Sequence, residues 1–212
     1  MSRSFDDLEP CQALTEIARD FHGRGWMAGT AGNLSARDRA DPASFWITAS
    51  GQAKGRLDST DFLRMALADD QVLGLGRAGI KPSAETSIHR AIYRLFPAAR
   101  VCLHVHTVDA SLAAARGGGT QATDLPLPPL EMIKGLGIWE ENPRVALPLF
   151  ANWLDVPAIA AEIEARFTAA PPPVPALMIH QHGVTVWGAS LQEAYNRVEI
   201  VEFLMSYLAR RL

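Results

Sequence analysis

The chain has 212 residues, of which 48% are hydrophobic and 20% are charged, and its formal net charge is −3. This size and composition are typical of one folded domain with a substantial core, so we expect residues 1–212 to form a single domain. The slightly negative charge gives no electrostatic reason to expect nucleic acid or an anionic membrane surface as the main partner.

Several features of the sequence favour the cytoplasm as the compartment. Two cysteines are too few for a disulfide framework. The N-terminal residues carry acidic side chains and no basic start followed by an apolar stretch, so no signal peptide is predicted. No apolar run approaches the roughly 20 residues that a membrane-spanning helix needs. We therefore expect a cytoplasmic protein.

Apolar residues at helical spacing, together with glycine and capping signals, predict five helices. Their expected ranges in chain order are 5–22, 84–96, 108–116, 156–167 and 190–209. Short apolar or β-branched runs between turn residues predict strands. Their expected ranges are 44–48, 62–66, 71–73, 101–106, 145–149, 176–179 and 184–187, with a further strand after the small-residue turn at 29–35.

The order of these elements shows no regular alternation of strand and helix. It favours a central, mainly antiparallel sheet with helices on its faces. The glycines at 117–119 are expected to end the helix before them, and the proline-rich stretch 124–129 is expected to be a loop.

The strand Val101–His106 carries two histidines two residues apart. Because side chains alternate along a strand, His104 and His106 leave on the same face and could hold one metal ion. Cys102 shares that face and could also be a ligand. Val101, Leu103 and Val105 lie on the other face and are expected to form a rigid, buried platform. A histidine pair of this kind also occurs among ordinary core or surface residues, so a metal site needs further ligands from elsewhere in the chain.

The segment 180–183 offers a third imidazole at a boundary between a strand and a turn. His182, directly before a glycine, is favoured over His180, although both could be ordinary turn histidines. Three neutral imidazoles and a water or substrate oxygen would form an open, catalytic kind of zinc site, with iron or manganese as alternatives.

Two glutamates have a structural and a catalytic interpretation. Glu85 could stabilise a helix N-terminus that Ser83 caps, and pair with His89, or it could enter the metal pocket as a ligand or base. Glu131 follows the proline-rich stretch and lies near Lys134. It could be a solvated loop residue, or it could transfer a proton beside a metal-bound carbonyl.

Short turns rich in glycine, serine and asparagine could bind an anion through backbone N–H groups and hydroxyls. The candidates are Gly32, Asn33, Ser50, Gly51 and Ser83. Each signal is weak alone, because these residues are common in ordinary turns. The sequence contains neither a P-loop nor a dinucleotide-binding fingerprint.

Taken together, these segments resemble the class II aldolase/adducin-like family over nearly the whole chain. The segments that carry the resemblance are, in family order, GTAGNLSAR, ITASG, KPSAETSIHRAIYRLFP, LHVHTVDAS and HQHGVTVWG. EMIKG, VALPLFAN and HGVTVWG make the chain most similar to the branch that dehydrates a methylthio-substituted ketose phosphate in methionine salvage. One departure is the histidine at 180, where relatives often have another residue, and we expect no ligation from it.

The resemblance implies an α/β/α domain and a homotetramer with active sites near subunit interfaces. It implies one Zn²⁺ per subunit, held by His104, His106 and His182. The substrate phosphate would be bound by the five turn residues named above. Glu131 matches the acid/base glutamate of the dehydratases. Glu85 matches an aldolase glutamate that contacts the metal or acts as a base, a position that differs between branches.

Two other functions are compatible with the sequence. A class II sugar-phosphate aldolase or epimerase would use the same zinc-stabilised enediolate, although EMIKG favours the dehydratase. A non-catalytic, adducin-like binding module would have no need of an open metal site, so the set of His104, His106, His182 and Glu131 argues against it.

Overall fold

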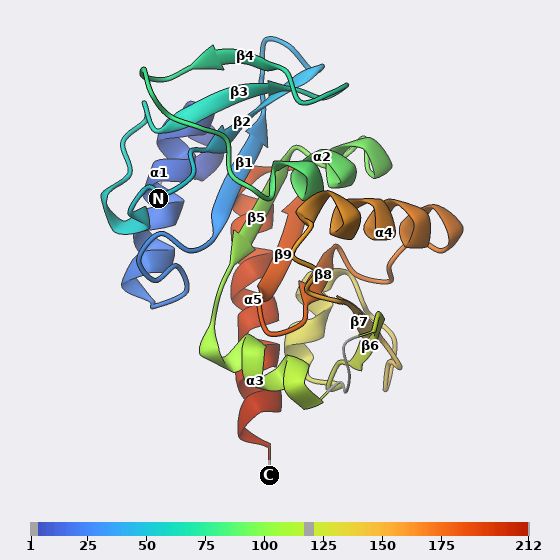
Figure 1. Ribbon diagram of the computed structural model, residues 1–212. Coiled ribbons are helices and arrows are strands. Elements are labelled where there is room, and N and C mark those ends of the chain that lie inside the picture. Colours follow the sequence, from blue (N-terminus) through green and yellow to red (C-terminus); the bar gives the residue numbers. More distant parts are fainter. Residues whose placement is uncertain (1–3, 117–120, 212) are drawn as a thin grey trace.

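The computed structural model describes residues 4–116 and 121–211 (Figure 1). Its five α-helices are α1 (Pro10–Gly23), α2 (Thr86–Leu95), α3 (Val108–Arg116), α4 (Val156–Ala169) and α5 (Leu191–Arg210). The strands are β1 (Asn33–Arg37), β2 (Ser44–Thr48), β3 (Phe62–Ala66), β4 (Val72–Leu75), β5 (Val101–Val105), β6 (Thr123–Pro126), β7 (Ala146–Phe150), β8 (Ala176–Ile179) and β9 (Gly183–Gly188). Three short 3₁₀ helices are η1 (Phe5–Asp7), η2 (Lys54–Arg56) and η3 (Glu131–Leu136).

All nine of these strands form one sheet, in the order β4-β3-β2-β1-β5-β9-β8-β7-β6. Every neighbouring pair is antiparallel except β7 and β8, which are parallel. The prediction of a mainly antiparallel central sheet with helices on its faces is therefore confirmed. β5 lies in the middle of the sheet, between β1 and β9 (Figure 1).

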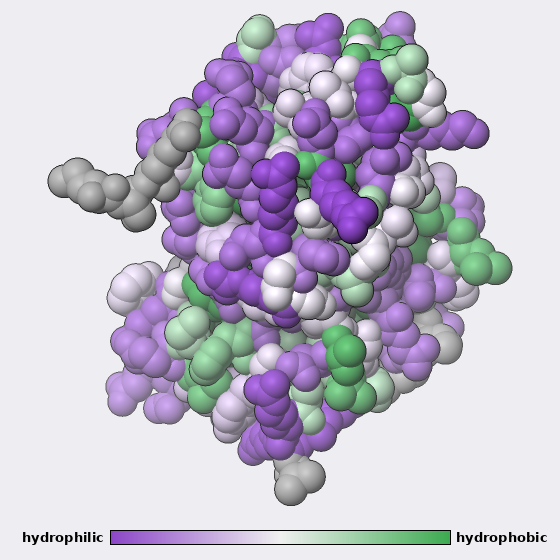
Figure 2. All heavy atoms as spheres, turned by 90° about the vertical axis from the view of Figure 1, so that its left-hand side faces the viewer, coloured by the Kyte–Doolittle hydropathy of each residue, from purple (hydrophilic) through white to green (hydrophobic). Residues whose placement is uncertain are grey.

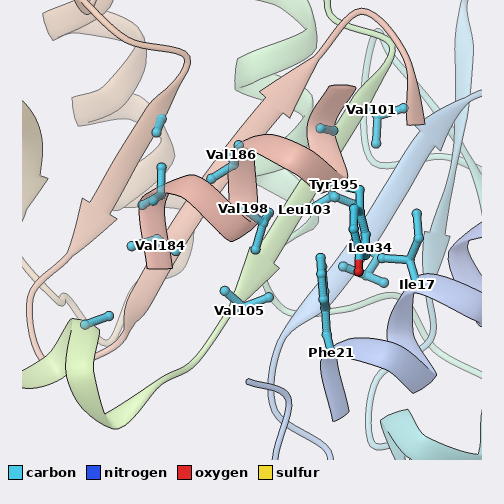
Figure 3. Packing of buried hydrophobic residues seen from close by; sticks show 14 of the residues in the cluster. Ile17, Phe21, Leu34, Val101, Leu103, Val105, Val184, Val186, Tyr195 and Val198 are labelled. Carbon is cyan, nitrogen blue, oxygen red and sulfur yellow. The ribbon is translucent and has the colours of Figure 1, made fainter. Parts of the chain in front are cut away.

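Helices cover both faces of the sheet and create two separate cores. On one face α1, α3 and α5 pack against Val101, Leu103 and Val105 of β5 (Figure 3). On the other face α2 and α4 pack together over a core that includes Cys102. The alternation expected for the histidine strand is thus confirmed. Full burial of each valine or leucine contributes roughly 1.5–3 kcal/mol, so the strand that carries the histidines is firmly held.

Several elements differ from the sequence-based expectations. Residues 5–22 do not form one helix, because η1 precedes a helix that begins at Pro10, where the fixed φ of proline suits a first helical position. Residues 124–126 of the expected loop belong instead to the edge strand β6, where proline is tolerated. At the start of α5, the hydroxyl of Ser190 accepts from the N–H of Glu193, and the Glu193 carboxylate accepts from the N–H of Ala189. The expected helix stop at 117–119 lies outside the described residues.

The surface is largely polar, with hydrophobic side chains in smaller groups (Figure 2). Exposed apolar residues on α3 and α5 include Val108, Leu112, Phe203 and Tyr207. None of the helices in the described ranges combines the length and apolarity needed to cross a membrane.

Glu202 of α5 is a buried carboxyl group that makes stability depend on pH. Its Oε2 accepts a hydrogen bond from Thr107, while Oε1 has no partner among the described residues. Burial raises the pKa of Glu202 to about 7, with the Thr107 bond opposing the rise. The folded state therefore binds this proton more tightly than the unfolded state, and stability falls as the pH rises from about 4.5 to about 7.

We expect Glu202→Gln to remove this loss of stability, because glutamine can accept the Thr107 bond without ionising. The difference in unfolding free energy between Glu202→Gln and the unaltered protein should be more favourable to the variant at pH 8 than at pH 4.5, by on the order of 3 kcal/mol. Urea unfolding of both proteins at the two pH values measures it. The exposed Glu9→Gln serves as the control. An identical pH dependence in Glu202→Gln and the unaltered protein would contradict the assignment.

Candidate active site

Four side chains from distant parts of the chain meet at one end of β5. Glu85 lies at the N-cap of α2, His104 is in β5, His106 follows that strand, and His182 lies in the turn between β8 and β9. One potential ligand atom from each lies within 4.8 Å of the others. The three histidines expected from the sequence are therefore brought together, and Glu85 is with them.

The contacts within this cluster are short. Nε2 of His104 lies 2.9 Å from Nε2 of His106 and 3.2 Å from Oε2 of Glu85. Nε2 of His182 lies 2.8 Å from Oε1 of Glu85. A nitrogen of each histidine and a carboxylate oxygen thus converge on a common point.

Neighbouring oxygens fix which ring nitrogen carries the proton. Nδ1 of His104 lies 2.9 Å from the carbonyl oxygen of Val184, which only accepts, so Nδ1 donates and Nε2 keeps its lone pair. Nδ1 of His182 faces Oδ1 of Asn152 at 3.2 Å, with the same consequence. Two lone pairs and a carboxylate directed at one point suit a bound divalent cation, and such outer hydrogen bonds are typical of metal-ligating histidines.

The protonation states agree with this arrangement. Burial lowers the pKa of His104, and it lowers the pKa of His106 to about 3, helped by the two other histidines. Both are therefore neutral imidazoles at physiological pH, the form that binds metals. Burial opposes ionisation of Glu85, but neighbouring groups, among them the Asn33 amide that donates to its Oε2, hold the pKa of Glu85 below its ordinary value. Three nitrogen ligands and one carboxylate fit zinc or a similar divalent ion.

Two glycines let the backbone approach the cluster closely. A Cβ on Gly183 would lie 2.1 Å from the carbonyl oxygen of Val105, a distance that no side chain could tolerate. A Cβ on Gly32 would lie 2.7 Å from the carbonyl oxygen of His104, and the φ of Gly32 is +77°. Gly32 is thus required by the backbone geometry beside the histidine strand, whatever its contact with substrate.

A chain of buried hydrogen bonds holds Glu85 in place. Nδ2 of Asn33 donates to Oε2 of Glu85 at 2.5 Å, and Oδ1 of Asn33 faces Nε2 of His89 at 2.5 Å. Because that oxygen only accepts, Nε2 of His89 donates and its Nδ1 accepts from Ser35 at 2.6 Å. The Ser35 hydroxyl oxygen then accepts from Tyr93 at 2.7 Å.

Every member of this chain has a defined donor and acceptor role. Burial lowers the pKa of His89 to about 3, which keeps the ring neutral, as the pattern requires. His89 therefore supports Glu85 through Asn33, and does not pair with it directly. The carboxylate of Glu85 is aimed at the histidines and does not cap α2.

A cavity of about 170 Å³ adjoins the four-residue cluster, and all five residues expected to bind phosphate line it. Its lining comprises Thr30, Ala31, Gly32, Asn33, Ala49, Ser50, Gly51, Lys54, Ser83, Ala84, Glu85 and His106. One of the possible donors is already engaged, because the N–H of Ser50 donates to the carbonyl of Lys81. The hydroxyl oxygen of Ser83 accepts from the N–H of Glu85, a bond that does not use its own O–H.

Within a single subunit, Glu131 lies away from the four-residue cluster and the cavity beside it. It begins η3, its side chain is 83% exposed, and its carboxylate accepts from Nζ of Lys134 at 2.8 Å. Among the residues that the structure describes, it belongs neither to the four-residue cluster nor to the cavity lining. Its acid/base role stays a prediction. His180 is also outside the cluster, and its N–H donates to the carbonyl of Phe150.

Sequence reasoning missed several residues of this site. Lys54 sits in a loop between small residues, a context that gave no sign of burial. Asn152 lies two positions after the end of β7, and a polar residue just beyond a buried strand is a signal that could have been used. Ser35 and Tyr93 carry no local signal, since their roles depend on partners more than 50 positions away.

Comparison with known proteins agrees with this site. The family model for the class II aldolase and adducin N-terminal domain matches residues 12–208. The chain belongs to the class II aldolase and adducin family. It is 56% identical to a methylthioribulose-1-phosphate dehydratase of Microcystis aeruginosa over 200 residues, which cover 94% of this chain and 95% of that protein. It is 44% identical to the protein of the same name in Leptospira biflexa, over 98% of this chain and all of the other.

Solved structures of similar proteins have the same fold. YgbL from Escherichia coli matches with a TM-score of 0.74 and 27% identity, over 93% of this chain and 86% of that one. L-fuculose-1-phosphate aldolase from Thermus thermophilus matches with a TM-score of 0.68 and 24% identity, over 93% of each chain. These similarities confirm the expected class II aldolase-like fold.

Proposed function

We propose that the chain is a metal-dependent methylthioribulose-1-phosphate dehydratase, a lyase of methionine salvage. The reaction removes water from 5-methylthioribulose 1-phosphate and yields 5-methylthio-2,3-dioxopentyl phosphate. The observation that carries the proposal is the cluster of three histidines and Glu85 beside a small polar cavity. The relatives with 56% and 44% identity, both named for this activity, support the choice of substrate.

His104, His106 and His182 would hold the metal, with Glu85 as a fourth ligand or as a base beside it. A divalent ion bound there, for which we propose Zn²⁺ at one per subunit, would polarise the C2 carbonyl of the substrate and acidify the proton on C3.

The chain's own residues would bind the substrate and move its protons. Gly32, Asn33, Ser50, Gly51 and Ser83 line the cavity in which we place the C1 phosphate. A base removes the proton from C3. Glu131, in its protonated form, donates a proton to the C4 hydroxyl as the C4–O bond breaks, and water leaves. The enol that remains tautomerises to the 2,3-diketone.

We also propose a homotetramer that works in the cytoplasm. The apolar residues that α3 and α5 expose support association with further copies, because such side chains are commonly covered in oligomers. Association would also give the exposed Glu131 a second subunit to face. Cys11 and Cys102 are free thiols, which is compatible with a reducing compartment.

A substrate panel tests the proposal against its nearest rival within the family. We expect the purified, metal-loaded protein to form the diketone from methylthioribulose 1-phosphate and to leave fuculose 1-phosphate and rhamnulose 1-phosphate intact. Rapid cleavage of either sugar phosphate, without diketone formation, would favour the aldolase. Absence of turnover on the whole panel, with metal bound, would favour a binding module.

A further inference from the structure

Lys54 is a buried lysine whose ammonium group is only partly satisfied by the protein. The residue is 1% exposed and begins η2. Its Nζ donates to the carbonyl oxygen of Thr30 at 2.8 Å and to that of Gln52 at 3.0 Å. An ammonium group has three N–H donors, so one is left beyond these two carbonyls.

Lys54 lies beside the cavity in which the substrate phosphate is placed, so its third N–H donor could meet a ligand there. Lys54 lines the same cavity as Ser50, Gly51 and Ser83, and among the described residues it is the sole lysine or arginine of the lining. The residues expected to bind phosphate offer neutral hydroxyl and N–H donors, whereas an ammonium group would give the phosphate a charge-assisted hydrogen bond, which is roughly twice as strong.

We propose that Lys54 binds the phosphate group of the substrate directly, through its third N–H, and so makes the site selective for phosphorylated ketoses. This inference rests on the proposed function, since it assigns a further binding residue to the same site. The two carbonyl bonds hold the ammonium group in position before the substrate arrives, which lowers the entropy lost on binding.

The electrostatic setting agrees with this role. Burial lowers the pKa of Lys54 to about 8, and the carboxylates of Glu85 and Asp61 limit the fall. The side chain is therefore mostly charged at neutral pH, although burial works against the charge. A phosphate dianion in the cavity would stabilise the charged form.

The test compares Lys54→Met with Arg56→Met. Methionine keeps the unbranched stem and removes the charge, and Arg56 is an exposed cation on the same short helix that does not line the cavity. We expect Lys54→Met to raise the inhibition constant of inorganic phosphate and the KM of the substrate on the order of 10- to 100-fold. Arg56→Met should change neither. An unchanged phosphate inhibition constant in Lys54→Met would overturn the proposal.

A merely structural role, in which Lys54 ties two loops together, predicts a different pattern. Dephosphorylated methylthioribulose serves as a second inhibitor for this comparison. Under the proposal its inhibition constant is the same in Lys54→Met as in the unaltered protein, and the metal content is also unchanged. Equal weakening of both inhibitors would assign Lys54 a structural role and overturn the proposal.

Two further measurements keep the inference independent of turnover and of the variant's folding. Calorimetric titration with inorganic phosphate distinguishes failure of the proposed function from failure of the Lys54 proposal. Phosphate binding that depends on Lys54, in a protein without dehydratase activity, would refute the function and support the phosphate site. If Lys54→Met fails to fold, sulfate binding to the unaltered protein is measured against pH, because sulfate stays dianionic. We expect the sulfate affinity to fall roughly tenfold per pH unit above about pH 8, and a constant affinity would overturn the proposal.

Discussion

His106→Ala is expected to lose the bound metal and all dehydratase activity above background. The substitution removes one of three nitrogen ligands and leaves Nε2 of His104 without its neighbour at 2.9 Å. Loss of one ligand should weaken metal affinity by a factor of at least about 100, since changes to outer partners alone cost 10- to 100-fold. Metal content after dialysis, measured by atomic emission, reports the result.

His180→Ala is the matched control for this substitution. His180 lies two positions before His182 but outside the cluster, and its structural contact is made by its backbone N–H. We therefore expect His180→Ala to keep full metal content. Full metal content in His106→Ala, or its loss in His180→Ala, would show that the ligand assignment is wrong.

Glu131→Gln is expected to keep the metal and lose dehydration. A positioned general acid contributes roughly 10²- to 10⁴-fold to the rate, so kcat should fall by about that factor. Because Glu131 is exposed and paired with Lys134 within one chain, folding and metal binding should be unaffected. The measurements are kcat from diketone formation and metal content on the same preparation.

Glu140→Gln controls for the loss of an exposed negative charge in the same region. We expect it to leave kcat unchanged. A near-normal rate in Glu131→Gln would show that Glu131 has no acid/base role in the reaction. Glu85, the carboxylate of the four-residue cluster, would then be the remaining acid/base group. A loss of metal in Glu131→Gln would also contradict the assignment, because it would make the effect one of metal binding.

Much of the fold follows from local patterns in the sequence. Strands β2, β3 and β8 begin and end at the predicted residues, because each is an apolar run bounded by turn-forming residues. Alternation along β5 was enough to place His104 and His106 on one face. The edge strand β6 was missed, since its Pro126 and the prolines that follow it argue against a strand unless its position at the edge is known.

The site was predictable where the family pattern names a residue, and less so where distant contacts decide. Asn33 was expected to bind phosphate, yet its amide also links Glu85 to His89, 52 and 56 positions away in the chain. The ammonium group of the buried Lys54 donates to the carbonyl of Thr30, 24 positions earlier. Such hydrogen bonds are set by the packing of the sheet and α2, so no local pattern reveals them.

Titration of metal-free protein with zinc tests the central claim most directly. Chelated protein is supplied with increasing zinc, and diketone formation from methylthioribulose 1-phosphate is measured at each step. We predict no activity without metal, a linear rise, and a plateau at about one zinc per chain, the stoichiometry of a single site with three histidine ligands. Full dehydratase activity in the chelated protein, or full zinc occupancy without diketone, would contradict it.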